Sequence, residues 1–323
     1  MRVLVTGASG FIGSAVVRRL AERGHDVRCL LRRTSDSGRI DDLPFEVAYG
    51  DLLQPRTLDA AVRDCEAVIH LASVSNWLHI HSGEVVSLGL GGTEAVLNAA
   101  VAGGCRRFLF VSSAASLGGE SRPVVRNEQD RPAPGIERLA YAHMKLRAEA
   151  LCRAAAGDRL DVVIVNPSEV YGAGDRDLVT AGNLVDFAQG PVTLVCDGGT
   201  GVVHLDDVAT GIVGALERGR AGERYLLSSE NLTNREIAAL VLELVGRRHP
   251  ILSCPRSVVR SLGWLGATLG VPLPFNPAMA PYATRYWFVD GGKARRELGL
   301  RFRSARDAIS DAVGWLQSEG RIA

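Results

Sequence analysis

The chain has 323 residues, 46% of them hydrophobic, so it can bury a large core, and we expect one extended domain with a smaller second lobe. Its 37 basic and 36 acidic side chains nearly cancel and form no long block of one sign, which argues against nucleic acid or an anionic membrane as a main partner. The six cysteines contain no C-x-x-C pair, and we interpret them as reduced thiols of a cytoplasmic protein.

The first half of the chain alternates short β-branched apolar runs with helical patterns. This alternation predicts an α/β fold with a doubly wound parallel sheet of the Rossmann type. There is no room for a signal peptide before the first run and no apolar stretch long enough to span a bilayer, so we expect a soluble protein. The expected strands are residues 3–5, 27–31, 47–49, 67–71, 108–111 and 162–165, and the expected helices are 11–23, 58–63, 84–102 and 141–156.

The second half is less regular. Its pattern predicts a strand end and helix over 204–217, a strand at 225–227, and helices near 234–245 and 305–317. We assign residues 1–172 and 202–229 to a nucleotide-binding domain, and residues 173–201 and 230–323 to a substrate-binding lobe.

A glycine-rich segment joins the first expected strand to the first helix. Gly7 permits a tight turn, Gly10 lets the backbone approach a pyrophosphate, and Gly13 allows close packing of helix on strand. The pyrophosphate would rest on the helix N-terminus, where free N–H groups favour an anion. We therefore expect a dinucleotide on this turn, with contacts also from Ser9, Phe11 and Ile12.

The end of the second expected strand bears on the type of dinucleotide. NAD-preferring sites usually place an acid there, but this chain has Arg32 and Arg33, and the first acid is Asp36. Since a guanidinium suits a 2′-phosphate, we expect NADP(H), with Arg32 as the residue that binds the phosphate. The alternative is a pair of solvated arginines, and NAD as the cofactor.

Asp51 and Leu52 follow the third expected strand. The Asp51 carboxylate is placed to accept a hydrogen bond from the adenine amino group. The other interpretation is that Asp51 is the N-cap of a helix that starts near Pro55.

Lys145 is one of only two lysines among the 37 basic residues, the other being Lys293. A lysine in so arginine-rich a chain points to a place that needs a compact ammonium. It stands four residues after Tyr141, so that on a helix the two side chains share one face. A neighbouring ammonium lowers the pKa of a phenol, and this pair therefore predicts a tyrosine that exchanges protons near neutral pH.

Together these motifs resemble the extended short-chain dehydrogenase/reductase family over nearly the whole chain. The nearest branch is that of hopanoid-associated sugar-epimerase-like and dihydroflavonol-reductase-like proteins. The resemblance is carried by Thr6-Gly7-x-x-Gly10-x-x-Gly13, Ser112-Ser113, Tyr141-x-x-x-Lys145, Asn166-Pro167-Ser168 with Val170-Tyr171-Gly172, His204 to Ala209, and Lys293 to Gly299.

The resemblance implies roles for the matching residues. Tyr141 would exchange a proton with the reacting oxygen, Lys145 would lower the Tyr141 pKa and hold the nicotinamide ribose, and Ser113 would hydrogen-bond the reacting oxygen. Ser112 is the less favoured candidate for that last role, and strand-end capping is the alternative for both serines. Pro167 and Ser168 would line the nicotinamide, and Leu71, Ala72 and Ser73, at the end of the fourth strand, would contact the cofactor, Ala72 through its backbone.

Departures from the family narrow the expected reaction. Sugar-nucleotide dehydratases carry an Asp-Glu pair where this chain has Ala114 and Ala115, so the acid and base for water elimination are missing. Thr200 replaces an arginine with which many epimerases bind a diphosphate, which counts against a nucleotide sugar. Gly89 replaces the usual asparagine of the Asn-Val-x-Gly-Thr helix and leaves the Tyr–Lys pair intact.

Residues that face the substrate are less clearly marked. Trp77, His79 and His81 follow the fourth strand, but the two histidines lack a third ligand, and we expect no metal site. Pocket lining and ordinary packing are alternatives for Tyr282, Tyr286 and Trp287, and a pocket lid and a core helix for the stretch around Trp264 and Leu265.

We therefore expect an NADP(H)-dependent oxidoreductase that acts on a small-molecule ketone or aldehyde and its alcohol. A sugar epimerase that retains its cofactor is the alternative, and a non-catalytic NADP-sensing protein is a third possibility that has no need of the Tyr–Lys pair. The family often dimerises through helices that correspond to residues 84–102 and 141–156, so we expect a homodimer.

Overall fold

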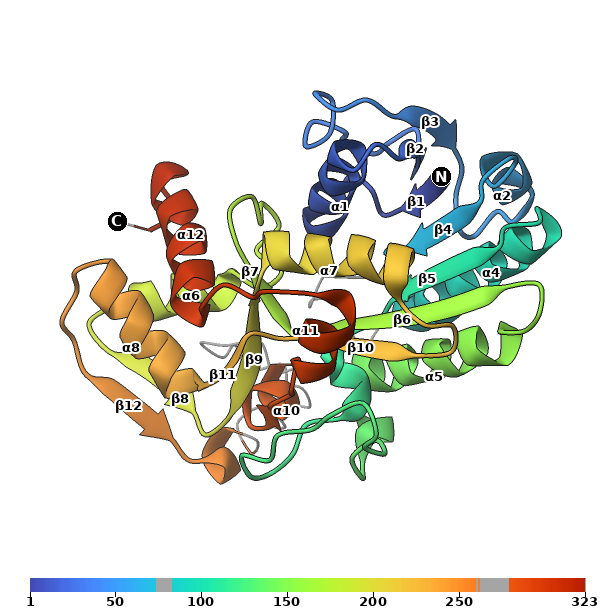
Figure 1. Cartoon of the computed structure of the whole chain (residues 1–323). Coiled ribbons are helices and arrows are strands. Elements are labelled where there is room, and N and C mark those ends of the chain that lie inside the picture. Colours follow the sequence, from blue (N-terminus) through green and yellow to red (C-terminus); the bar gives the residue numbers. More distant parts are fainter. Residues whose placement is uncertain (74–82, 260, 262–278, 323) are drawn as a thin grey trace.

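The computed structural model describes residues 1–73, 83–259, 261 and 279–322. Its centre is a seven-stranded parallel sheet with the order β3-β2-β1-β4-β5-β6-β10 (Figure 1). The chain order reverses between β1 and β4, the place where such sheets bind ligands. The strands are β1 (Arg2–Thr6), β2 (Asp26–Leu31), β3 (Glu46–Tyr49), β4 (Ala67–His70), β5 (Arg107–Val111), β6 (Asp161–Pro167) and β10 (Arg224–Leu227).

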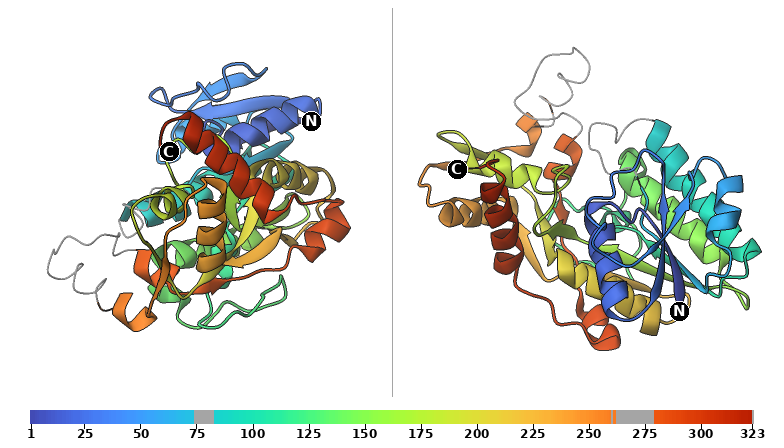
Figure 2. Two further views of the ribbon diagram at one scale, coloured as in Figure 1. Left: turned by 90° about the vertical axis from the view of Figure 1, so that its left-hand side faces the viewer. Right: turned by 90° about the horizontal axis from the view of Figure 1, so that it is seen from above.

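Helices cover both faces of this sheet because its strands are apolar on both faces. In β1, for example, Val3 and Val5 enter one core cluster and Leu4 enters the other. The first cluster is covered by α1 (Phe11–Glu22), α7 (Leu205–Arg218) and α11 (Gly292–Leu298), and the second by α2 (Arg56–Ala61), α4 (Gly92–Ala102) and α5 (Ala140–Ala155) (Figure 2). The predicted doubly wound α/β fold is confirmed.

The helix expected over residues 84–102 is interrupted. It consists of α3 (Gly83–Val86), a π-helical turn η2 (Ser87–Gly91) and α4. A Cβ atom on Gly89 would lie 2.8 Å from Met144 Cγ on α5, so a larger residue at position 89 would force the Met144 side chain to move. Turns of this kind occur often at functional sites.

A second, smaller layer lies beside the carboxyl ends of the central strands (Figure 1). In it, β9 (Gly199–His204) pairs with β7 (Glu169–Tyr171), β11 (Glu230–Thr233) and β13 (Tyr286–Trp287), and β8 (Thr193–Cys196) pairs with β12 (Ile251–Cys254). A third core cluster holds α6 (Gly182–Ala188), α8 (Asn234–Leu244) and α12 (Ala305–Ser318) against this layer. Three short helices lie between these elements: the 3₁₀-helices η3 (Ala114–Leu117) and η4 (Ile136–Arg138) and the α-helix α10 (Ala280–Ala283).

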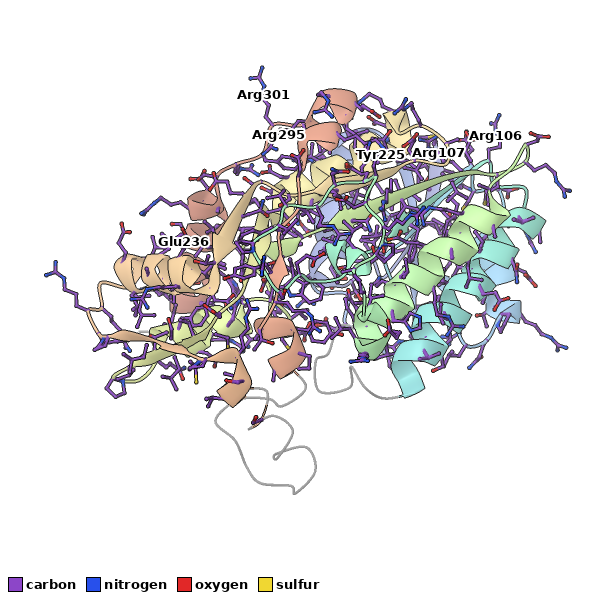
Figure 3. All side chains as sticks on the ribbon, turned by 90° about the horizontal axis from the view of Figure 1, so that it is seen from below. Arg106, Arg107, Tyr225, Glu236, Arg295 and Arg301 are labelled. Carbon is purple, nitrogen blue, oxygen red and sulfur yellow. The ribbon has the colours of Figure 1, made fainter. Side chains whose placement is uncertain are left out.

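Arginine and lysine serve different purposes in this structure. Arg106 and Arg301 project from the surface, whereas Arg107 lies against the body of the protein and donates to Ala215 O of α7 at 2.9 Å (Figure 3). Lys293 is buried, donates to Arg224 O at 2.8 Å and lies 4.6 Å from the centre of the Tyr225 ring. The second lysine of the chain thus occupies a narrow, enclosed place, as the scarcity of lysine suggests.

Two further expectations can be compared with the structure. All six cysteines are free thiols, four of them buried. Among the described residues, no helix is long and apolar enough to cross a membrane, and no group of three or more metal-ligating side chains is found.

Candidate active site

The glycine-rich turn between β1 and α1 has the shape expected of a dinucleotide cradle. Gly7 has a φ of +72°, and a Cβ atom there would lie 2.8 Å from Ala72 N at the end of β4. A Cβ atom on Gly13 would collide with the carbonyl of Gly7. The turn is therefore packed so tightly that its exposed lining is backbone, which suits a pyrophosphate.

The N-terminus of α1 is open to an anion. Gly10 is the N-cap, and among the described residues no side chain caps the helix and its first turn contains no acid. Ser9, Phe11 and Ile12 lie at this helix start, and Ser9 O accepts a hydrogen bond from Arg39 Nη1 at 3.2 Å. Unpaired N–H groups together with the helix dipole attract phosphate, so the residues fit the expected cofactor.

Three arginines lie on the segment after β2. Arg33 stacks on Tyr49, with its Cζ 4.8 Å from the ring centre. Arg39, which the sequence analysis did not single out, is partly buried and also reaches Gly174 O at 3.5 Å. Arg32 has an exposed side chain, and its backbone N–H donates to Ser35 Oγ at 3.0 Å.

Asp51 does not cap a helix. The helix after β3 begins at Arg56 with Pro55 as its N-cap, and the Asp51 carboxylate instead accepts the N–H of Leu53 at 2.9 Å. The capping interpretation is wrong, because the chain turns once more before the helix starts. Leu52 packs in the core beneath α2 and α4. The adenine contact of Asp51 stays a prediction.

A buried histidine at the end of β4 links the glycine-rich turn to α4. His70 Nδ1 lies 2.7 Å from Thr6 Oγ1, and His70 Nε2 lies 3.1 Å from Thr93 Oγ1. Burial lowers the His70 pKa to about 3, so the ring is neutral. The sequence analysis missed this link, whose one local sign is a histidine inside an apolar strand. It fixes β4, after which Leu71, Ala72 and Ser73 follow.

The structure brings together Ser113, Tyr141 and Lys145 at the carboxyl end of β5. Ser113 caps η3, its Oγ accepting the Ala115 N–H at 3.2 Å, and it also hydrogen-bonds the side chain of Tyr141. Ser112 is instead engaged by Glu149, to which its hydroxyl donates at 2.7 Å. Ser113 thus caps η3 and also hydrogen-bonds Tyr141, so both interpretations of this serine apply.

Lys145 lies one turn from Tyr141 on α5. Its Nζ donates to Val111 O at 3.1 Å and lies 5.9 Å from the centre of the Tyr141 ring. Burial lowers the Lys145 pKa to about 8, opposed by the negative charge of Glu149. An ammonium with so low a pKa exchanges protons readily near neutral pH.

The pKa of Tyr141 differs from the expectation. Burial raises it, and the hydrogen bond with Ser113 opposes the rise. The direction predicted from Lys145 alone was wrong, because removing water from around a phenol disfavours its charged form. In this structure Tyr141 is therefore held in its protonated form.

The remaining expected neighbours lie at the end of β6 and in the second layer. Ser168 donates both its N–H and its hydroxyl to Leu227 O, at 3.0 and 3.2 Å, and Pro167 is buried. Tyr282 stacks on Trp287 with 5.6 Å between ring centres, and both pack in the cluster that contains Tyr141.

Other predicted pocket residues lie elsewhere or outside the described part of the chain. Tyr286 packs edge-on against Phe288, with 5.3 Å between the ring centres, and beneath Arg256. Trp77, His79 and His81, and Trp264 and Leu265, lie outside the described residues.

The comparison with protein families identifies the relationship. The model described as "NAD dependent epimerase/dehydratase family" matches residues 3–228. The chain belongs to the NAD-dependent epimerase/dehydratase family. The resemblance to extended short-chain dehydrogenases/reductases is thereby confirmed, and with it an enzyme class that uses a nicotinamide cofactor.

Several members of this family are similar over most or all of the chain. A protein named sterol demethylase protein B from Methylococcus capsulatus is 32% identical and covers 100% of both chains. A farnesyl-dihydroquinoline-oxide ketoreductase from Stigmatella aurantiaca is 30% identical, covering 97% of this chain and 96% of its own. Dihydroflavonol 4-reductase from Zea mays is 29% identical over 79% of this chain and 76% of its own.

Solved structures agree on the fold. A nucleoside-diphosphate-sugar epimerase from Pseudomonas aeruginosa superimposes with a TM-score of 0.83 at 27% identity, covering 100% of this chain and 99% of that one. Reductases and epimerases therefore both stand among the relatives.

Proposed function

We propose that this protein is an NADP(H)-dependent oxidoreductase that transfers hydride between the nicotinamide and a small-molecule ketone or aldehyde. The observation that carries the proposal is the contact between Ser113 and Tyr141, with Lys145 one turn away. Two hydroxyl groups that meet beside an ammonium suit a carbonyl oxygen that gains a proton.

Each of the three residues has its own role in the proposed reduction. When bound, the nicotinamide supplies the hydride. Tyr141, held protonated by burial, donates its phenolic proton to the carbonyl oxygen, and Ser113 hydrogen-bonds the same oxygen. Lys145 then stabilises the phenolate that Tyr141 leaves behind. In the oxidation of an alcohol the same proton returns to Tyr141.

Arg32 is proposed to bind the 2′-phosphate of NADP(H). Of the three arginines after β2, Arg33 is stacked on Tyr49 and Arg39 is engaged by Ser9 O, whereas the Arg32 side chain is exposed at the strand end. A free guanidinium can bind a phosphate with two parallel hydrogen bonds. The glycine-rich turn would hold the pyrophosphate, and Asp51 the adenine.

The proposed substrate is an uncharged carbonyl compound with an apolar or aromatic substituent. Tyr282 and Trp287 form an aromatic wall packed beside Tyr141. Thr200 is buried and hydrogen-bonds Glu169, and the partners of Glu169 in the described part of the chain include no cation that could bind a diphosphate. Residues 173–201 and 230–323 are proposed to hold the substrate, and the ketoreductase and dihydroflavonol reductase relatives support this choice.

Substitution of Tyr141 tests the proposal. With NADPH and a ring-substituted acetophenone as probe, Tyr141→Phe is expected to lose about 10²–10⁴-fold in turnover, because the proton donor is gone. Its Kd for NADPH should stay within about twofold of wild type. Tyr286→Phe is the matched control, since Tyr286 packs against Phe288 and Arg256. Turnover retained in Tyr141→Phe would contradict the assignment.

Calorimetric titration tests the cofactor. On protein checked for bound nucleotide, NADPH should bind reversibly and more tightly than NADH, and Arg32→Ser should weaken NADPH binding about tenfold or more. Arg33→Ser is the matched control. Protein that arrives loaded with NAD would favour the epimerase alternative, which the similarity to the Pseudomonas enzyme keeps in view.

A homodimer that pairs α4 and α5 of two chains is also proposed. Sedimentation equilibrium at micromolar concentration should give twice the chain mass of 34.5 kDa. A single species of monomer mass would rule the dimer out.

A further inference from the structure

Helix α5 carries a row of polar side chains spaced by four residues. After Tyr141 and Lys145 come Glu149 and Arg153, all of which lie along one side of the helix. Glu149 is fully buried, whereas the Arg153 side chain is 39% exposed. The row thus runs from the proposed proton donor, through a buried acid, to the surface.

Every side of the Glu149 carboxylate is engaged. Oε1 accepts the Ser112 hydroxyl at 2.7 Å and Asn166 Nδ2 at 2.6 Å. Oε2 accepts Arg153 Nη2 at 2.8 Å and lies 3.5 Å from Arg224 Nη1. These partners come from the ends of β5 and β6, from α5 and from β10, so one side chain joins four elements.

A fully buried carboxylate is costly, and apolar packing often replaces such a group without loss of stability. Since Glu149 lies close to the candidate active site, we looked for a role beyond joining helix α5 to the central sheet. Two of its connections lead to the proposed catalytic residues.

The first connection is mechanical. Asn166 donates to Ser113 O at 3.0 Å as well as to Glu149, and Ser112 precedes Ser113 in the chain. Glu149 thus holds the backbone of Ser113 from both sides, and Ser113 in turn hydrogen-bonds Tyr141. A shift of this segment would separate the two hydroxyl groups that meet the substrate oxygen.

The second connection is electrostatic. The titratable groups around Lys145 are Tyr141, Glu149 and Cys152 on its own helix and His70 on β4. Burial keeps the His70 ring neutral, with a pKa of about 3, and raises the Cys152 pKa to about 12. Among the described residues around Lys145, Glu149 is therefore the group that provides a negative charge near neutral pH. Arg153 and Arg224 face Glu149 and partly offset that charge.

We propose that Glu149 is a positioning residue, which holds Ser113 against Tyr141 and keeps Lys145 in its ammonium form. The proposal rests on the function proposed above. Glu149 is not a catalytic residue in this proposal, because it acts on the reacting atoms only indirectly, by way of Ser113 and Lys145.

The scarcity of lysine makes a direct test available. Protein grown with lysine labelled with ¹³C at Cε has two side-chain lysine signals, from Lys145 and Lys293, and Lys293→Arg assigns them. In a pH titration of the full chain, Glu149→Gln should move the titration of Lys145 to lower pH by about half a unit or more, because the neighbouring negative charge is gone. Lys293, paired with Glu223, should titrate as in wild type.

Arg153→Met gives the opposite expectation. It removes a cation from Glu149 and leaves the carboxylate charge less compensated, so Lys145 should titrate at higher pH than in wild type. Both substitutions break the ion pair between Glu149 and Arg153, yet they should shift the titration of Lys145 in opposite directions. A general loosening of the fold would shift it in the same direction in both variants. Since Arg153 is partly exposed, this variant also decides the question if Glu149→Gln does not fold.

Kinetics test the mechanical half. With the acetophenone probe, Glu149→Gln should lower kcat about tenfold with little change in KM, and the alkaline loss of activity should begin at lower pH. Glu217→Gln is the control, because Glu217 also pairs with an arginine, Arg23, at 3.0 Å but lies on α7. The proposal is overturned if the Lys145 titration stays where it is in Glu149→Gln and Arg153→Met, or moves in the same direction in both. This holds even if the result for Tyr141→Phe has supported the proposed function.

Discussion

The seven-stranded central sheet and the smaller second layer each enclose a glutamate, and the two are stabilised in opposite ways. Glu149 has two arginine side chains around it and a lysine one turn away on the same helix. Glu169, on β7 of the second layer, is hydrogen-bonded by the neutral side chains of Tyr171, Asn183 and Thr200. The same residue type is therefore embedded in charge in one half and in neutral donors in the other.

In the function proposed above, the two glutamates serve different purposes. Burial raises the Glu169 pKa, although its hydrogen bonds oppose the rise, because no cation is among its partners in the described structure. A carboxyl group of this kind offers hydrogen bonds without a full charge, which suits recognition of an uncharged ligand. Around Glu149 the charges act on Lys145, where proton transfer takes place in the proposed mechanism.

The largest expected effect comes from removing a cation of the Glu149 group. The Arg224 side chain is 11% exposed and donates to Glu128 O at 2.8 Å as well as approaching Glu149. Arg224→Met should lower the free energy of unfolding by about 3–5 kcal/mol, because it strands a buried charge. Urea denaturation measures the loss. Arg153→Met, at a more exposed position, should cost about 1 kcal/mol or less, and equal losses in the two variants would contradict the comparison.

A smaller effect, of opposite sign, is expected at Glu169 in the second layer. Because the folded-state pKa of Glu169 lies above its unfolded value, the folded state holds its proton longer, and stability is lost as pH rises through that window. Glu169→Gln removes this loss. The free energy of unfolding of the variant, relative to that of wild type, should therefore rise by up to about 1 kcal/mol between pH 4 and pH 7. Denaturation at both pH values measures the gain. If the variant instead becomes less stable than wild type as the pH rises toward 7, Glu169 stabilises the fold as an anion.

Thiol chemistry gives the smallest effect, since it leaves stability unchanged. Burial raises the pKa of Cys29 on β2 and of Cys152 on α5 to about 12. Cys196 and Cys254, on the paired strands β8 and β12, are partly exposed. Ellman's reagent at pH 8 should modify at most these two in the folded protein and all six after denaturation. Rapid labelling of Cys29 would reveal opening of the central sheet.

The central sheet was predictable because its signals are local. Each strand is a short apolar run, and the turn at Gly7 follows from spacing within eight residues. The prediction of one helix over residues 84–102 was only partly right, since residues 87–91 form a π-helical turn, where Gly89 lies against Met144, a residue far along the chain. Local pattern reports which segments are helical, whereas the packing of one helix on another decides how regular each remains.

The candidate site divides in the same way. The spacing of Tyr141 and Lys145 on one helix was visible in the sequence, and the structure gives them one face. The partners of Glu149 were not visible, because Ser112, Asn166 and Arg224 meet it only when separate strands end side by side. The raised pKa of Tyr141 was missed because burial is a property of the folded chain.

The close approach of Gly89 to Met144 also constrains the order in which this enzyme could change. An asparagine at position 89, the residue usual in its family, would have its Cβ 2.8 Å from Met144 Cγ and closer still to the sulfur. Such a change requires the Met144 side chain to move or to be shortened, and shortening the buried Met144 alone would remove packing from the second core cluster. Positions 89 and 144 are thus coupled through a single contact, so a change at one alters the packing available to the other.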